Sequence, residues 1–330
     1  MLFDNFFEGI KQEPGYRSFF ISDHNLVSGL RKKRKVFDPN GSMRSIHQRF
    51  LEYLRPLETR VNQTNRFCCF NSTNFNAGVH ATFGFFFYQI DLKNAYQSVN
   101  GQKLAQVLCS LDGKLRGQEE EVYEFLKKTC LLKMGIGLIT GAVASPILFD
   151  IYVGVLLDPG LVQLSDELNL SYSRYRDDLT FSNKRWPGRR PIGRLKRKRI
   201  RQIILNAGFQ INHRKSAVLR ISKGSVLITG INLVRERKKD SVGECRTQLP
   251  RRYLRKIRGL MHLVMTGKSD VNPARIHGMM GVFWNSVSEL GCRPHISELN
   301  RTEQKLIRQY EEFAKRFSNF KPSHSQKKEW

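Results

Sequence analysis

The chain has 330 residues, with 56 Lys or Arg against 29 Asp or Glu, so its formal charge is +27 and its isoelectric point is about 10.2. A chain this basic favours a polyanionic partner, above all nucleic acid. Its 40% apolar content fits a globular protein. Six Cys occur without a Cys-x-x-Cys pair or a His at zinc-finger spacing, which argues against a zinc site and a disulfide framework.

The most apolar segment, residues 134–157, is interrupted by Pro146 and Asp150, so it does not predict a membrane span. The first eight residues lack the basic start of a secretory signal. We therefore expect a cytoplasmic protein with reduced cysteines and no membrane partner.

The hydrophobic pattern predicts both strands and helices. In chain order they are a basic segment at 33–39, a turn at 76–80, an apolar strand at 84–90, helices within 103–133, short strands at 170–174 and 179–182, a loop and basic helix within 184–205, three helices at 249–267, 273–290 and 297–317, and a polar tail at 321–330.

Three carboxylates stand at the ends of predicted strands. Asp177 and Asp178 fall on the tip of a hairpin, and Asp91 ends the apolar strand at 84–90. Neighbouring Asp side chains repel each other unless a divalent cation neutralises them, and hard cations prefer oxygen ligands. An ordinary solvated turn is the alternative for Asp177 and Asp178, because Asp favours turns. A charged group at the end of a buried strand, as at Asp91, favours a metal site.

The segments around these carboxylates resemble the catalytic blocks of reverse transcriptases. Tyr-Ser-Arg-Tyr-Arg-Asp-Asp-Leu-Thr-Phe-Ser, at 172–182, is most similar to bacterial retron enzymes, although that family usually has Ala where this chain has Arg176. The resemblance implies an α+β right-hand polymerase, with a palm of antiparallel sheet and helices. The expected divisions are an N-terminal region and fingers at 1–84, a palm at 85–234 with finger helices inserted at about 100–135, and a helical thumb and tail at 235–330.

The same resemblance implies that Asp91, Asp177 and Asp178 hold two Mg²⁺ ions, with Mn²⁺ as a substitute. Tyr96 stands where the family holds an aromatic ring beneath the sugar, which predicts selection of dNTPs over ribonucleotides. A core aromatic is the alternative for Tyr96.

Other residues are matched to nucleotide binding. Arg34 is the candidate clamp on the triphosphate, since a guanidinium bonds phosphate oxygens while staying charged; a solvated basic run is the alternative. Thr140 and Gly141 begin a block that supports the nucleotide in the family, with Thr140 in place of the usual Gln. Lys215 is matched to a Lys that protonates the leaving pyrophosphate, or else it is a solvated strand residue.

RNA contacts are expected from two regions. Asn76 and His80 match an Asn-Ala-x-x-His element of retron enzymes, with a plain turn as the alternative. Thumb cations at Arg251, Arg252 and Arg255 and the basic run at 184–201 form stripes that suit a phosphate backbone.

The resemblance thus implies an RNA-directed DNA polymerase of retron type in the bacterial cytoplasm. It would use a structured noncoding RNA as template and primer, take dNTPs and make an RNA-linked single-stranded DNA. Antiphage defence beside an effector protein is expected from the family. Two alternatives stay open, namely another defence reverse transcriptase that makes untemplated or repetitive DNA and a non-catalytic RNA-binding scaffold.

Overall fold

A computed structural model describes residues 4–24, 31–64, 73–81, 85–183, 192–221, 225–235, 245–287, 296 and 299–320. These residues form two compact units. Unit 1 contains Met1–Asn71 and Phe86–Leu219, and unit 2 contains Ser72–Phe85 and Arg220–Trp330.

Unit 1 combines a central sheet, a separate β-ribbon and a shell of helices. Its elements are β1 (Tyr16–His24), β2 (Arg31–Pro39), α1 (Gly41–Thr64), β3 (Phe86–Lys93), α3 (Gly101–Leu111), α4 (Glu119–Thr129), α5 (Ser145–Leu156), α6 (Asp158–Glu167), β4 (Leu170–Tyr175), β5 (Asp178–Asn183), α7 (Arg194–Asn206), β6 (Gln210–Ile211) and β7 (Ala217–Arg220), with short 3-10 turns at Asp4–Phe6, Tyr96–Ser98 and Gly113–Leu115.

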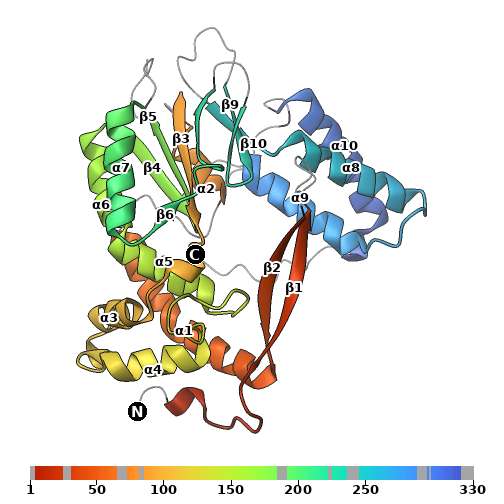
Figure 1. Cartoon of the computed structure of the whole chain (residues 1–330). Helices are drawn as coiled ribbons and strands as arrows, with labels where there is room; N and C mark the ends of the chain where they lie inside the picture. The colour runs from red at the N-terminus through yellow and green to blue at the C-terminus, as the bar shows by residue number, and fades with distance from the viewer. Residues whose placement is uncertain are drawn as a thin grey trace. The chain divides into compact units, whose positions relative to one another are not determined.

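The central sheet has the strand order β4-β5-β3-β6, with β7 also paired to β3. The pairs β4–β5, β5–β3 and β3–β6 are antiparallel, and Figure 1 shows α6 and α7 side by side next to this sheet. Apolar side chains of β3 and β5, such as Phe87, Ile90 and Phe181, are buried in the core. Burial of these apolar side chains stabilises the sheet.

The predicted helices of unit 1 are confirmed, because α3 and α4 fall within 103–133 with small extensions and α7 covers the basic helix. In α4, three Glu occupy the first turn and Lys127 and Lys128 the last, which suits the helix dipole. Asn100 caps α3 by accepting a hydrogen bond from the Lys103 amide, 3.0 Å away.

The β1–β2 ribbon contains the predicted basic segment and is anchored at its base by Tyr16. The Tyr16 hydroxyl donates to the Thr129 carbonyl oxygen at 2.5 Å and lies 2.5 Å from His47 Nε2. Burial lowers the pKa of His47 to about 4, so this ring is neutral near pH 7.

Unit 2 joins a small sheet to a helical bundle. Its elements are α2 (Thr73–Gly78), β8 (Ser225–Ile228), β9 (Ile231–Arg235), β10 (Cys245–Gln248), α8 (Arg251–Met265), α9 (Pro273–Val287), α10 (Arg301–Arg316) and a 3-10 turn at Ser318–Phe320. The sheet order is β10-β9-β8, and all pairs are antiparallel. The three predicted C-terminal helices are present, although α10 begins four residues later than expected, where Asn300 and Glu303 form a capping box.

Residues 72–85 belong to unit 2, whereas the sequence analysis placed 72–84 at the end of the N-terminal region and Phe85 at the start of the palm. The helix α2 packs against β8, β9 and β10, and the Cys245 amide donates to the Ala81 carbonyl oxygen at 2.9 Å. The division into fingers, palm and thumb stays a prediction.

Within the described parts of the chain, no single helix is long and apolar enough to span a membrane. The helices α5 and α6 meet that criterion only together, as a pair bent by 48°.

We expect the free energy of unfolding to fall as the pH drops below about 6.5. Burial lowers the pKa of His80 in unit 2 to about 3. Because the unfolded chain binds this proton at a higher pH than the folded chain does, stability is complete above the unfolded pKa and is lost as the pH falls toward 3. The loss is about 1.4 kcal/mol at about pH 5.5.

Thermal melts over this pH range test the effect. His80→Gln should give a shallower dependence of the melting temperature on pH than the wild type, while replacement of the exposed His262 by Gln should leave the dependence unchanged. An unchanged dependence in His80→Gln would contradict the assignment.

Candidate active site

The hairpin of β4 and β5 carries two of the three predicted carboxylates. The strands pair from Leu170 opposite Asn183 to Tyr175 opposite Asp178, which leaves Arg176 and Asp177 as the turn. Arg176 has a φ of +56°, in the left-handed region that tight hairpin turns require. The predicted hairpin tip is therefore confirmed.

Asp91 lies on the neighbouring strand, directly opposite Asp178 in the β3–β5 pair. Residues that are opposite each other in an antiparallel pair project from the same face of the sheet. The Leu92 amide also donates to the Asp177 carbonyl oxygen at 3.0 Å, which ties the turn to β3. Strand pairing thus gathers Asp91, Asp177 and Asp178 at one end of the sheet.

These carboxylates influence one another electrostatically. Asp178 is accessible to solvent, but the surrounding protein partly desolvates its carboxylate. This burial and the charges of Asp177 and Asp91 raise the pKa of Asp178 to about 6. The Lys215 ammonium acts in the opposite direction and lowers that pKa. The cluster is therefore a site where negative charge accumulates.

Asp91 is held by the segment that follows β6. Its Oδ2 accepts from Lys215 Nζ at 2.7 Å, and its Oδ1 accepts from Asn212 Nδ2 at 2.9 Å. The Asn212 amide donates to the Asp91 carbonyl oxygen at 2.8 Å. The structure thus brings Lys215 to the carboxylates and adds Asn212, which the sequence analysis missed. Action of Lys215 on the leaving group stays a prediction.

Among the described residues, no group of three or more His, Cys, Asp or Glu side chains is arranged so that it could hold a metal ion. The donor chemistry nevertheless suits a hard cation, because three carboxylates supply oxygen ligands, and burial together with the charges of Asp177 and Asp91 raises the pKa of Asp178. Binding of Mg²⁺ by Asp91, Asp177 and Asp178 stays a prediction.

Tyr96 lies in a short 3-10 turn after β3, and its ring stacks on Phe149 with centroids 4.7 Å apart. Burial raises the pKa of Tyr96, and the charges of Arg176 and Asp177 also act on it, so the ring lies near the carboxylate turn. The ring is only partly buried. Its position is compatible with the predicted sugar contact, which stays a prediction.

Thr140 and Gly141 lie in the loop before α5 and contact the end of β2. The Phe37 amide donates to the Thr140 carbonyl oxygen at 2.9 Å, and the Thr140 hydroxyl lies 3.4 Å from Gln97 Nε2, which donates to it. Gln97 directly follows Tyr96 and was missed in the sequence, because nothing in the local pattern indicates this contact. Nucleotide binding by Thr140 and Gly141 stays a prediction.

Arg34 lies on β2, where its backbone pairs with Ile21. Its side chain lies outside what the structure describes. Asn76 and His80 are buried in unit 2, at 0% and 1% exposure, because α2 packs onto the small sheet. Contact of either side chain with RNA would require this packing to open, and the RNA-binding role of both stays a prediction.

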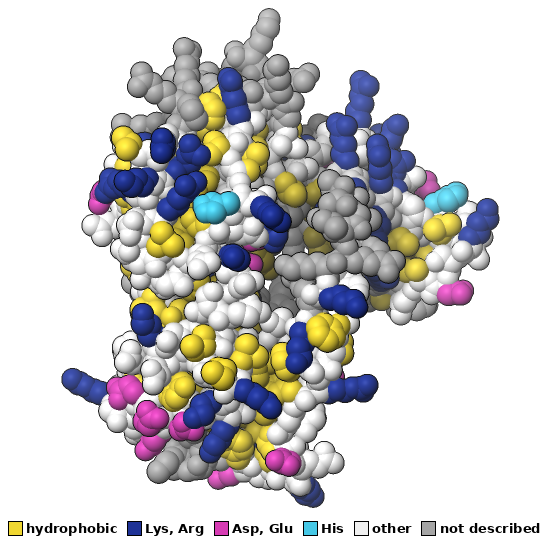
Figure 2. Space-filling view, viewed as in Figure 1, with side chains coloured by type: hydrophobic (Ala, Val, Ile, Leu, Met, Phe, Trp, Pro, Cys, Tyr) yellow, Lys and Arg dark blue, Asp and Glu magenta, His cyan; other side chains and the backbone are white. Residues whose placement is uncertain are grey.

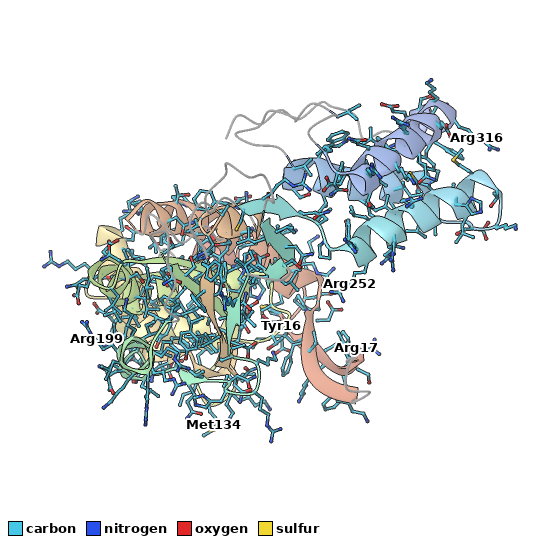
Figure 3. All side chains as sticks on the ribbon, turned by 90° about the horizontal axis from the view of Figure 1, so that it is seen from above. Tyr16, Arg17, Met134, Arg199, Arg252 and Arg316 are labelled. Carbon is cyan, nitrogen blue, oxygen red and sulfur yellow. The ribbon has the colours of Figure 1, made fainter. Side chains whose placement is uncertain are left out.

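Two exposed basic surfaces stand out in Figure 2, one over α7 and the other over α8 and α10. On α8, Leu254 and Ile257 are buried, while the exposed cations are Arg251, Arg252, Arg255 and Lys256. Figure 3 shows Arg252 near the start of this helix. The amphipathic pattern thus turns the predicted RNA-binding cations toward solvent.

The cations of α7 are largely engaged within unit 1. Their contacts are Lys196 Nζ to the Leu168 carbonyl oxygen at 2.8 Å, Arg199 to Glu167 at 2.6 Å, Arg201 to the Tyr88 hydroxyl at 3.2 Å and Arg197 over the Tyr88 ring at 5.9 Å. Figure 3 labels Arg199 on this helix. The basic helix therefore has a structural role, and the loop at 184–191 lies outside the described residues.

Behind the hairpin, buried charges form a cluster that the sequence analysis did not predict. Arg174 is fully buried and donates to both carboxylate oxygens of Asp158, at 2.8 to 3.0 Å, and to Asp150 Oδ1 at 2.9 Å. The Tyr172 hydroxyl also donates to Asp158, at 2.8 Å. The sequence contained signals for this cluster, namely an Arg in a buried strand and two Asp in apolar helices. A buried charge needs a partner of opposite charge, so these residues could have been matched to each other.

Comparison with protein families agrees with this geometry. The family model described as "Reverse transcriptase (RNA-dependent DNA polymerase)" matches residues 30–254. The chain belongs to the reverse transcriptase family. No curated protein matches significantly.

Several solved telomerase structures resemble this reverse transcriptase. Apo telomerase from Candida tropicalis is 9% identical, with a TM-score of 0.53, and the match covers 91% of this chain and 63% of that one. Telomerase from Candida albicans, in complex with a TWJ fragment of telomeric RNA, is 11% identical, with a TM-score of 0.49 and coverage of 95% and 61%. The chain thus spans about six-tenths of these proteins, and the first match confirms the α+β polymerase fold.

Replacement of Gly141 by Ala is expected to lower the free energy of unfolding by about 1–3 kcal/mol. Gly141 has a φ of +105°, and a Cβ there would overlap the Phe37 carbonyl oxygen. Chemical denaturation measures the change. Gly113→Ala is the matched control, because a Cβ there meets nothing within 4 Å and no left-handed φ is required. Equal stability of the two variants would contradict the prediction.

Proposed function

We propose that this reverse transcriptase binds a structured noncoding RNA and copies part of it into single-stranded DNA that stays joined to the RNA, as retron enzymes do. The observation that carries the polymerase chemistry is the register that sets Asp91 opposite Asp178, with Lys215 bonded to Asp91. The retron assignment is supported by the motifs at 172–182 and 76–80.

The chain's own residues account for the parts of this reaction. Asp91, Asp177 and Asp178 would hold Mg²⁺, which when bound activates the attacking hydroxyl and stabilises the departing pyrophosphate. Lys215, an ammonium beside these carboxylates, would donate a proton to the leaving pyrophosphate oxygen. Tyr96 would contact the sugar and exclude a 2′-hydroxyl.

The RNA is proposed to lie along exposed cations. The exposed face of α8 presents Arg251, Arg252 and Arg255, which suits a phosphate backbone because each contact releases bound counterions. Arg34 on β2 is proposed to clamp the triphosphate. Action in the bacterial cytoplasm, in antiphage defence beside an effector protein, is part of the proposal and rests on the retron resemblance.

Sequencing of bound nucleic acid tests the proposal. The chain would be expressed with its native flanking DNA, purified and compared with an Asp177→Asn/Asp178→Asn variant and with Asp270→Asn, a charge change at an exposed site in unit 2. We expect short DNA of defined sequence, joined to RNA, from the wild type and from Asp270→Asn, and none from the double variant.

Other products would contradict the proposal and indicate a different function. Unlinked or repetitive DNA would indicate a different defence reverse transcriptase. RNA alone in every sample would indicate a binding scaffold without chemistry.

Lys215→Ala is expected to lower kcat for dNTP incorporation by about 10²-fold, the range for loss of a general acid, with little change in RNA affinity. Lys127→Ala is the control, because Lys127 also forms an exposed ion pair, with Glu124 at 2.5 Å. Single-turnover incorporation measures the rate, and equal rates in the two variants would exclude the role of Lys215.

A further inference from the structure

Arg176 occupies the turn between the two strands that carry the carboxylates, and the proposed chemistry assigns it no part. We infer that Arg176 is a positioning residue, which fixes the turn of Asp177 and Asp178 against the start of α5. The effect of Arg176 on catalysis rests on the proposed function. Its structural role rests on the contacts that its side chain and backbone make.

The Arg176 side chain reaches α5 by two contacts. Its Nη1 donates to the Pro146 carbonyl oxygen at 2.9 Å and forms an ion pair with Asp150 Oδ2. Asp150 is fully buried, whereas the Arg176 side chain is 26% exposed. A charge-assisted contact to a buried carboxylate is stronger than an exposed one, because water screens it less.

The Arg176 backbone is held as well. Its carbonyl oxygen accepts from Arg174 Nη1 at 3.1 Å, and Arg174 is itself fixed by Asp158 and Asp150. Two Arg and two Asp thus balance their charges in one cluster. A non-glycine residue at positive φ costs conformational free energy, and these contacts offset that cost.

The contacts place Arg176 between the two parts of the site. On one side, the Asp177 carbonyl oxygen bonds to the Leu92 amide, next to Asp91. On the other side, Pro146 stands five residues after Gly141, at the start of α5. Arg176 therefore links the carboxylate turn to the segment that contains Thr140 and Gly141.

Loss of Arg176 should act locally. Asp150 keeps its contact with Arg174, so no buried charge is left without a partner. The expected effect is a displaced or more mobile turn in a folded protein.

The test compares Arg176→Ala and Arg176→Lys with Lys127→Ala, which removes an ion pair to Glu124 at the surface of the same unit. The first measurement is hydrogen exchange of the peptide that contains Leu92, because that amide reports the position of the turn. The second is kcat and KM for dNTP incorporation, with melting temperature and RNA affinity as checks on folding.

For Arg176→Ala we expect exchange of the Leu92 peptide to increase at least tenfold and kcat to fall about tenfold or more, with a smaller change in KM. Lys keeps the charge but not the guanidinium geometry by which Nη1 contacts both Pro146 and Asp150, so Arg176→Lys should be intermediate. Lys127→Ala should match the wild type in both measurements.

Wild-type exchange and kcat in Arg176→Ala would overturn the inference. So would a loss of kcat that only follows a fall in melting temperature and RNA affinity, since this would mean general unfolding. If the wild type makes no DNA, the proposed function fails. The exchange measurement then still decides whether Arg176 holds the turn.

Discussion

The register between β3 and β5 is the constraint on which the rest of the site depends. Side chains alternate between the two faces of a strand, so a shift of one residue would carry Asp91 away from Asp178. Buried apolar residues on both strands, including Phe87 and Phe181, resist such a shift. The hydrophobic core of unit 1 therefore sets the distance between the carboxylates.

Charge is distributed unevenly in this reverse transcriptase. The chain carries a formal charge of +27, yet its central feature is a cluster of carboxylates. Lys215 and Asn212, from the segment that follows β6, bind the Asp91 carboxylate and hold it at that cluster. The surplus of Lys and Arg lies elsewhere, as on the exposed face of α8, where it suits a phosphate backbone.

The sequence was sufficient to predict features that depend on local pattern. Alternation predicts the hairpin at Asp177 and Asp178, and the apolar run predicts the strand that ends at Asp91. Features that depend on distant contacts could not be predicted in this way. The burial of His80 depends on strands more than 140 residues later in the chain, and the pairing of Arg174 with Asp158 depends on how α6 packs against β4.

The Arg174 cluster also restricts how the chain can change over time. One planar guanidinium serves two carboxylates and a carbonyl oxygen, and no other side chain offers that many donors in one plane. Replacement of Arg174 would leave the buried Asp158 carboxylate without its ionic partner, and replacement of Asp158 would leave Arg174 with Asp150 alone. A substitution at Arg174 is therefore expected to need compensating changes at Asp150 and Asp158.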